Sequence, residues 1–370
     1  MKEVNWWRTT FGEEEKRRIG AAIDGEHISQ GQVTAAFEQA LGELLGVPHV
    51  VATTSGSMAI LMALMALGVG PGDEVIVPNR TWIATAHAPH LLGAKVRLVD
   101  VLPDLPIMDV SLVEAAITSR TRAIIPVHLN GRSSDLAALN ALAARNGIPV
   151  VEDAAQALAS RNADGFLGTQ ATMGCFSLSV AKIIATGQGG FTVTRDEAIY
   201  KRLLALRTHG VSDVIHAQWT SPGFNFRFND ILASVGLAQL GRLEGRIERV
   251  RAIYQRYQRA LSRMDFIRLL PVDLDAGEIP IYIETLVPRR EELMAFLSAR
   301  GIQTRPFYPD LNQAAYFENH QAFPRSEHFG KQGLFLPSGP EQPMAAIETV
   351  LEALGQFGQN TEGGGHSRQS

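Results

Sequence analysis

Short apolar runs recur along the first half of the chain, and stretches of helical length separate most of them. The strand-like runs lie at 49–52, 74–77, 96–99, 123–127, 149–151, 175–178 and 191–194, and the helical stretches at 57–67, 82–92, 111–116 and 136–144. Several runs are apolar throughout, which is typical of a sheet covered on both faces. The pattern predicts an open α/β sheet with a largely parallel core, in which ligands bind at the carboxyl ends of the strands.

The pattern changes after Arg227. Apolar residues at helical spacing predict one long helix over 243–261, followed by a strand at 279–287 and a helix at 291–300. The arginines on the long helix are interleaved with acidic residues, so we interpret them as a solvated face. We expect a large domain over 1–244, a smaller α+β domain over 245–358 and a polar, glycine-rich, disordered tail over 359–370.

Composition narrows the class of protein. The net charge of −4 shows no basic excess, so no nucleic-acid partner is expected. Cys175 is the only cysteine, which rules out an intramolecular disulfide and favours a reducing compartment. The longest apolar run, 58–69, is too short to span a bilayer, and the N-terminal residues lack a signal-peptide core. We expect a soluble cytoplasmic enzyme or binding protein with no membrane partner.

Lys182 follows an apolar run and precedes a glycine-rich turn. A lysine at the end of a buried strand tends to lose its proton, because burying an unpaired ammonium is costly. A neutral lysine attacks carbonyl groups and forms Schiff bases. The alternative is a surface lysine before a loop.

Three further positions carry candidate chemistry. The small residues of 53–57 precede a helix and suit an anion held by backbone amides, although Ser and Gly also cap helices without a ligand. Asp153 follows an apolar strand, where it either meets a cation or caps the next helix. Trp82 either lies flat on an aromatic ligand or belongs to the core. Together with Lys182, these features fit pyridoxal phosphate, which needs an amine, a carboxylate for its ring nitrogen and a phosphate site.

The chain also resembles a known family, the sugar aminotransferases of the DegT/DnrJ group, from about residue 5 to 355. The blocks that carry the resemblance are Gly31-Gln-Val33, Phe37-Glu38, Thr54-Ser-Gly-Ser57, Gly70-Pro-Gly-Asp-Glu-Val75, Thr81-Trp-Ile-Ala-Thr85, Val151-Glu-Asp-Ala-Ala-Gln156, Phe176-Ser177, Lys182, Gly187-Gln-Gly-Gly190 and Gly223-Phe-Asn-Phe-Arg227. The resemblance implies an aspartate-aminotransferase-like fold (fold type I), with a seven-stranded, mainly parallel sheet in the large domain.

By this resemblance, Lys182 holds pyridoxal phosphate as a Schiff base and later moves the proton between cofactor and substrate carbons. Asp153 pairs with the ring nitrogen, Gln156 lies near the ring hydroxyl and Trp82 stacks on the ring. Pyridoxamine phosphate is the intermediate form, and no metal site is expected.

The resemblance also assigns the phosphate to Gly56, Ser57 and Ser177. Asn225 is expected to reach the phosphate of a neighbouring subunit, which implies a homodimer with shared active sites. The implied reaction moves an amino group from L-glutamate to a nucleotide-linked keto sugar, in the biosynthesis of amino sugars for polysaccharides or natural products.

The chain departs from the family pattern at three positions. Val180 replaces a common proline, Gln188 replaces a common acid, and Asn312 stands near a common histidine. The last two affect the substrate rather than the cofactor. A cyclitol (scyllo-inosose-type) aminotransferase shares every motif and stays an alternative. A dehydratase relative would have histidine in place of Lys182, and a non-catalytic binding or regulatory relative would be expected to lose Lys182 or Asp153.

Overall fold

Seven strands form the main sheet of the computed structural model, which describes residues 3–26, 28–211, 215–216, 218–219, 221–317 and 321–363. Two hydrogen-bonded groups, β1-β9-β8-β5 and β3-β2-β4, are joined by the parallel bridges Ile124↔Val150 and Val127↔Asp153. β9 runs antiparallel to both of its neighbours, and the other pairings are parallel. The predicted α/β fold is therefore confirmed. The strands are β1 (His49–Thr53), β2 (Glu74–Pro78), β3 (Lys95–Val99), β4 (Thr121–Ile124), β5 (Val151–Asp153), β8 (Met173–Ser177) and β9 (Gly190–Thr194).

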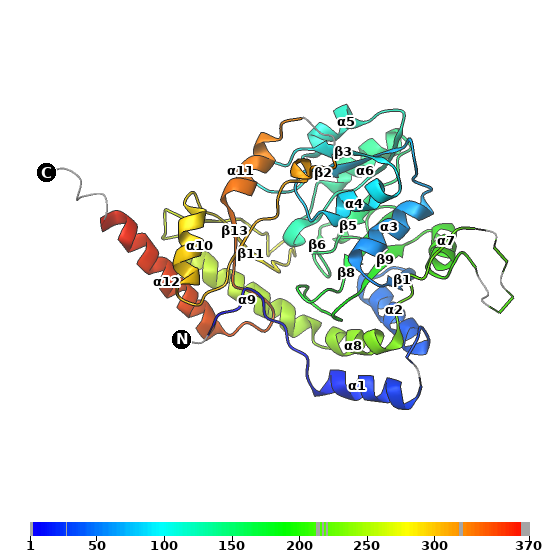
Figure 1. Cartoon of the computed structure of the whole chain (residues 1–370), viewed down its shortest axis with the longest axis horizontal. Helices are drawn as coiled ribbons and strands as arrows, with labels where there is room; N and C mark the ends of the chain where they lie inside the picture. Colours follow the sequence, from blue (N-terminus) through cyan, green and yellow to red (C-terminus); the bar gives the residue numbers. More distant parts are fainter. Residues whose placement is uncertain are drawn as a thin grey trace.

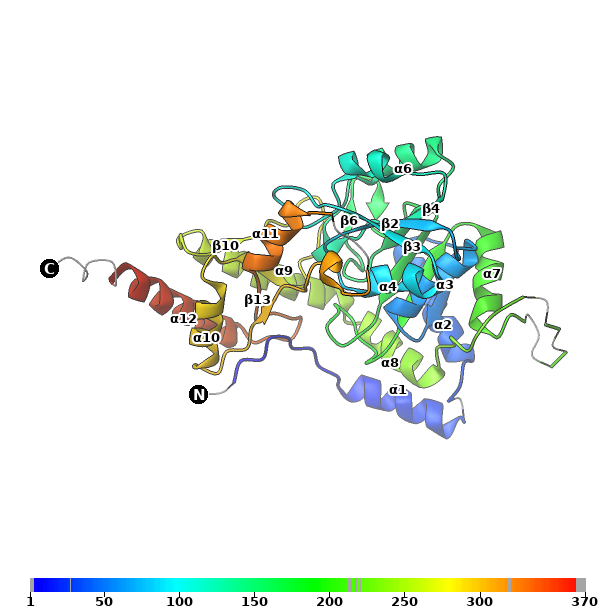
Figure 2. The ribbon, with the colours of Figure 1, turned by 45° about the horizontal axis from the view of Figure 1, so that its top comes forward.

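Helices cover both faces of this large sheet. Along β2, Val75 and Val77 pack into one apolar cluster with α3 and α4, whereas Ile76 packs into another with α6. Figure 2 shows α6 on the other side of β4 from α3. This two-sided burial explains why the strands are apolar throughout. The helices of this part are α1 (Glu13–Asp24), α2 (Gln32–Leu45), α3 (Gly56–Ala66), α4 (Ala84–Leu91), η1 (Val110–Leu112), α5 (Val113–Ala116), η2 (Leu129–Gly131), α6 (Leu136–Arg145), α7 (Glu197–Arg207) and α8 (Asp230–Leu240), and a short hairpin pairs β6 (Arg161–Asn162) with β7 (Gly165–Phe166).

A second, antiparallel sheet lies on the opposite side of the molecule from α3 and α7 (Figure 1). Its order is β10-β11-β13-β12, so the single strand predicted at 279–287 is in fact a shorter strand within a four-stranded sheet. None of the described helices is both long and apolar enough to cross a membrane. The elements of this part are α9 (Leu243–Leu261), β10 (Arg268–Leu269), β11 (Ile283–Leu286), α10 (Arg290–Ser298), β12 (Arg305–Pro306), η3 (Leu311–Gln313), α11 (Pro324–Gln332), β13 (Gly333–Leu336) and α12 (Met344–Gly363).

Two expectations about this second part need correction. α12 continues through residues 359–363, where a disordered tail was predicted, and its apolar face packs on the small sheet as far as Phe357. The remaining predicted tail, 364–370, lies outside the described residues. The arginines of α9 are not all solvated, since the side chain of Arg246 is only 2% exposed. Arg246 donates hydrogen bonds to the carbonyl oxygens of Ile183 and Thr10, which explains its burial.

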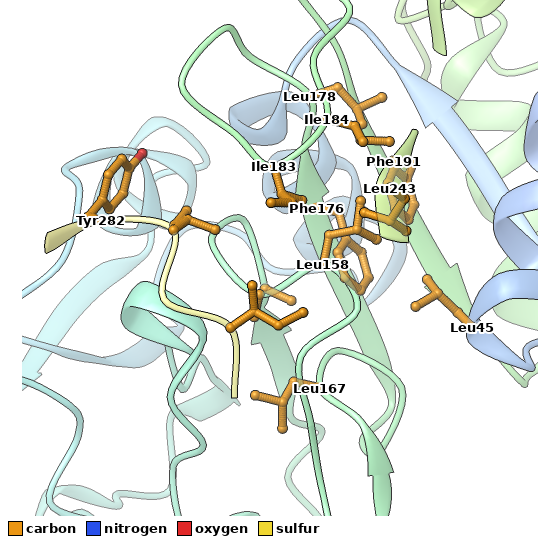
Figure 3. Packing of buried hydrophobic residues seen from close by; sticks show 14 of the residues in the cluster. Leu45, Leu158, Leu167, Phe176, Leu178, Ile183, Ile184, Phe191, Leu243 and Tyr282 are labelled. Atoms are coloured by element: carbon orange, nitrogen blue, oxygen red, sulfur yellow. The ribbon is translucent and has the colours of Figure 1, made fainter. Parts of the chain in front are cut away.

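The main core cluster anchors the segment around Lys182. Phe176 and Phe191 stack with ring centroids 4.5 Å apart, joining β8 to β9. Ile183 and Ile184, directly after Lys182, are buried in the same cluster (Figure 3). The chain on one side of the lysine is therefore fixed by apolar burial.

Buried ion pairs hold the small sheet against the large one. Arg132, after η2, pairs with Glu284 of β11, and Arg80, after β2, pairs with Asp310. Asn130 adds a third connection, because its side-chain amide donates to the Tyr282 carbonyl and to Glu284. Each of these groups has less than a tenth of its surface exposed, so its partner compensates for the lost solvation.

We expect Glu284→Gln to lower the free energy of unfolding by about 3–5 kcal/mol, because it leaves the buried guanidinium of Arg132 without its counter-charge. Denaturant unfolding measures this loss. Glu327→Gln is the matched control, since the Glu327–Lys331 pair is exposed and should contribute about 1 kcal/mol or less. Equal, small losses in both variants would contradict a structural role for the buried pair.

Candidate active site

A cavity of about 340 Å³ opens at the carboxyl ends of the large-sheet strands. The small sheet and the N-terminal segment around Trp6 meet the large sheet there. Seven of the residues singled out from the sequence line it. They are Gly56, Ser57, Trp82, Asp153, Gln156, Ser177 and Lys182.

Lys182 is held in place by hydrogen bonds to the carbonyl groups around it. The indole of Trp7 donates to Val180 O at 2.9 Å, and the hydroxyl of Tyr282 donates to Ala181 O at 2.8 Å. On the other side, Arg246 donates to Ile183 O at 3.1 Å. Three donors from distant parts of the chain therefore fix the backbone of the lysine.

The pKa of the Lys182 amine lies close to neutral pH. Burial lowers the pKa of Lys182 from its ordinary 10.5 to about 8, and the negative charge of Asp153 opposes part of that shift. Near pH 8 the lysine therefore exists both as a nucleophilic amine and as a proton donor.

Asp153 is a buried carboxylate that forms hydrogen bonds but no ion pair with any described residue. Its oxygens accept hydrogen bonds from the Thr85 hydroxyl at 2.8 Å and from the Ala155 amide at 3.1 Å. Burial raises the pKa of Asp153 despite these bonds and despite the nearby charge of Lys182. A cationic group in the cavity would offset that cost, as a protonated ring nitrogen does.

The N-terminus of α3 forms the anion-binding end of the cavity. Ser55 caps the helix by accepting from the Met58 amide at 3.2 Å. A Cβ atom on Gly56 would lie 2.8 Å from that of Ser177, so glycine is required for the helix start to approach β8 this closely. The first amides of the helix and the hydroxyls of Ser57 and Ser177 are thereby brought to one place, which suits a phosphate.

Trp82 and Gln156 occupy the walls between these groups. Trp82 is 53% exposed and meets the ring of Tyr308 edge-on at 5.0 Å, so it is not a core tryptophan. The side-chain oxygen of Gln156 accepts a hydrogen bond from the backbone amide of Asn130 at 2.9 Å. This bond leaves the NH₂ group of Gln156 as a donor for a ligand oxygen.

Asn225 is the one predicted cofactor residue that does not line this cavity. It lies in the segment after α7, where its side-chain oxygen accepts from Arg227 Nε at 3.0 Å. Of the two departures expected to affect the substrate, Gln188 lines the cavity, whereas Asn312 does not. Asn312 instead exchanges two hydrogen bonds with Asn79.

Sequence reasoning missed several residues of the site. Trp6 and the small-sheet residues Tyr282 and Tyr308 line the cavity but are far from the motifs in sequence. No local pattern identifies them. Thr85 was detectable, because it stands one helical turn after Thr81 in the Trp82 block and its hydroxyl meets Asp153.

Pyridoxal phosphate fits these residues. The helix start with its hydroxyls matches the phosphate, and the buried carboxylate of Asp153 matches the ring nitrogen. The amine of Lys182 faces the same cavity and matches the aldehyde. Within the described part of the chain, no group of three or more His, Cys, Asp or Glu side chains is arranged to hold a metal ion.

Comparison with known proteins agrees with this arrangement. Residues 9–355 match the model of the DegT/DnrJ/EryC1/StrS aminotransferase family. The GDP-perosamine synthase of Escherichia coli O157:H7 is 33% identical over 362 residues, covering 96% of this chain and 99% of that protein. DesV of S. venezuelae, solved with a ketimine intermediate, superposes with a TM-score of 0.89 at 33% identity, covering 93% of this chain and 94% of DesV. Spr1654 of Streptococcus pneumoniae, solved in PLP and PMP forms, superposes with a TM-score of 0.91 at 25% identity. The PLP form covers 97% of this chain and 99% of its own.

The pKa of about 8 for Lys182 predicts that its amine becomes reactive two to three pH units earlier than an ordinary lysine. Competitive acylation of the cofactor-free protein at a series of pH values, with peptide mapping, should give half-maximal labelling of Lys182 near pH 8. In unfolded protein the half-maximum should move to about pH 10.4. Asp153→Asn should move it below 8, since the carboxylate favours the ammonium. A half-maximum near 10 in the folded protein would contradict the burial of this amine.

Proposed function

Because the chain belongs to the DegT/DnrJ/EryC1/StrS aminotransferase family, we propose that it transfers an amino group from L-glutamate to a nucleotide-linked keto sugar. One observation carries this proposal. The amine of Lys182 and the buried carboxylate of Asp153 line the same cavity as a helix start suited to phosphate.

We infer that the cofactor is pyridoxal phosphate, which supplies an aldehyde that condenses with amines and a protonated ring that accepts electron density. Gly56, Ser57 and Ser177 would hold its phosphate. Asp153 would keep the ring nitrogen protonated, and Thr85 and Ala155 hold that carboxylate in place.

Lys182 would carry the proton in both halves of the reaction. Its amine has a pKa of about 8, so it accepts and returns a proton at small cost near neutral pH. The hydrogen bonds of Trp7, Tyr282 and Arg246 to neighbouring carbonyls keep the backbone of the lysine fixed while its side chain moves.

We further propose a homodimer in which Asn225 serves the phosphate site of the partner subunit. Asn225 does not line the cavity of its own chain. The segment that carries it also exposes Trp219 and Phe224, at 79% and 65% of their surfaces. Large apolar side chains gathered on one segment favour contact with another protein surface. A cytoplasmic location also stays a prediction.

The first test is an absorbance spectrum of the purified protein with pyridoxal phosphate, followed by excess L-glutamate. We expect a long-wavelength band that glutamate bleaches, because the amino group passes to the cofactor. Keto sugars on nucleotides and free cyclitol ketones are then screened for restoring the band. Restoration by scyllo-inosose and not by any nucleotide sugar would assign the cyclitol reaction instead, and a band that no amino donor changes would contradict an aminotransferase.

Two substitutions test the assigned roles. Lys182→Ala should abolish the band and turnover, since no other lysine of the described residues lines the cavity. Asp153→Asn should reduce turnover by a hundredfold or more, on the order of general acid–base and electrostatic effects, with a much smaller loss of cofactor. Steady-state kinetics and the bound-cofactor ratio measure both. Normal turnover in either variant would remove that residue from the mechanism.

A further inference from the structure

Arg305 lies on β12, at the edge of the small sheet, and lines the cavity together with Lys182. Its guanidinium stacks over the ring of Trp6, 4.2 Å from the centroid. Its positive charge also acts on the hydroxyls of Tyr282 and Tyr308, because it lowers the pKa of both groups against the stronger effect of their burial. The guanidinium therefore stands beside the small-sheet wall of the cavity.

Arg305 is exposed, and unlike the buried arginines of this region it has no acidic partner among the described residues. Arg80 and Arg132 are both neutralised by buried carboxylates, Asp310 and Glu284. A guanidinium presents its N–H groups in a planar fork that binds a carboxylate through two parallel hydrogen bonds. Stacking on Trp6 fixes the plane of that fork and leaves its edge available.

We propose that Arg305 binds the carboxylate of the amino donor, with Trp6 as the surface that orients the guanidinium. This inference rests on the proposed aminotransferase function. In an amino acid the carboxylate is bonded directly to the carbon that carries the amine, so its binding group must lie in the same cavity as Lys182. Arg305 meets that requirement. The diphosphate of a nucleotide sugar lies beyond the sugar ring and is the rival ligand for the same guanidinium.

Glutarate and GDP distinguish these two ligands, because neither carries an aliphatic amine or a ketone that could react with the cofactor. Their dissociation constants are measured by calorimetry on the cofactor-loaded protein. Arg305→Met should weaken glutarate binding by about ten- to a hundredfold, as expected for a charge-assisted hydrogen-bonded pair, and leave GDP binding unchanged. Arg305→Lys keeps the charge but lacks the fork of N–H groups. Its affinity for glutarate should fall between those of the wild type and Arg305→Met.

Arg300→Met is the matched control. The guanidinium of Arg300 also stacks on an aromatic ring, 3.5 Å from the centroid of Phe296, but it does not line the cavity. Its replacement should leave both dissociation constants unchanged. The cofactor band and melting temperature of each variant report whether its fold is intact.

The glutamate half-reaction gives a second measure. In Arg305→Met the glutamate concentration for half-maximal bleaching should rise about ten- to a hundredfold, whereas the maximal rate should change much less. Unchanged glutarate affinity in Arg305→Met, or loss of GDP affinity in its place, would overturn the assignment of Arg305 while wild-type bleaching by glutamate preserves the proposed function. Failure of the wild-type protein to be bleached would overturn both.

Discussion

The amine of Lys182 and the carboxylate of Asp153 lose much of their hydration at the end of the large sheet. The rest of the site must hold both groups in place despite that cost. Burial alone makes the charged forms of Lys182 and Asp153 costly, and each reduces the cost for the other. The arrangement persists because the surrounding fold fixes both groups. Asp153 ends β5, inside the sheet, and the chain after Lys182 is pinned by Ile183 and Ile184 in the core. The apolar core thus maintains the electrostatics of the cavity.

Much of the large sheet and its motif residues could be predicted from the sequence, because the relevant information is local. Each predicted strand is a short, largely apolar run, and each chemical group follows closely after such a run. Asp153 is the last residue of β5, Lys182 comes shortly after β8, and Ser57 lies in the first turn of the helix that follows β1. The carboxyl ends of neighbouring strands meet at one edge, so adjacency in sequence becomes adjacency in space.

The remainder of the site depends on contacts that no local pattern encodes. Trp6 meets Tyr282 and Arg305 only after the N-terminal segment docks on the small-sheet part of the chain. Arg246 resembles its neighbours on α9 in sequence, and its hydrogen bonds to the distant carbonyls of Ile183 and Thr10 distinguish it. Of the three small-sheet strands that the sequence did not predict, two contain only two residues each, too few for a periodic pattern.

The contacts of the N-terminal segment, residues 4–8, determine how late in synthesis this protein can finish folding. Residues 4–8 are synthesised long before the partners that they bind, since Trp7 contacts Val180 and backbone bridges join Val4 to Ile302 and Trp7 to Ser338. During synthesis, Trp6 and Trp7 have no native surface to pack against until almost the whole chain has emerged. The wall of the cavity that Trp6 forms is therefore completed late, after the large-sheet residues of the site have already been synthesised.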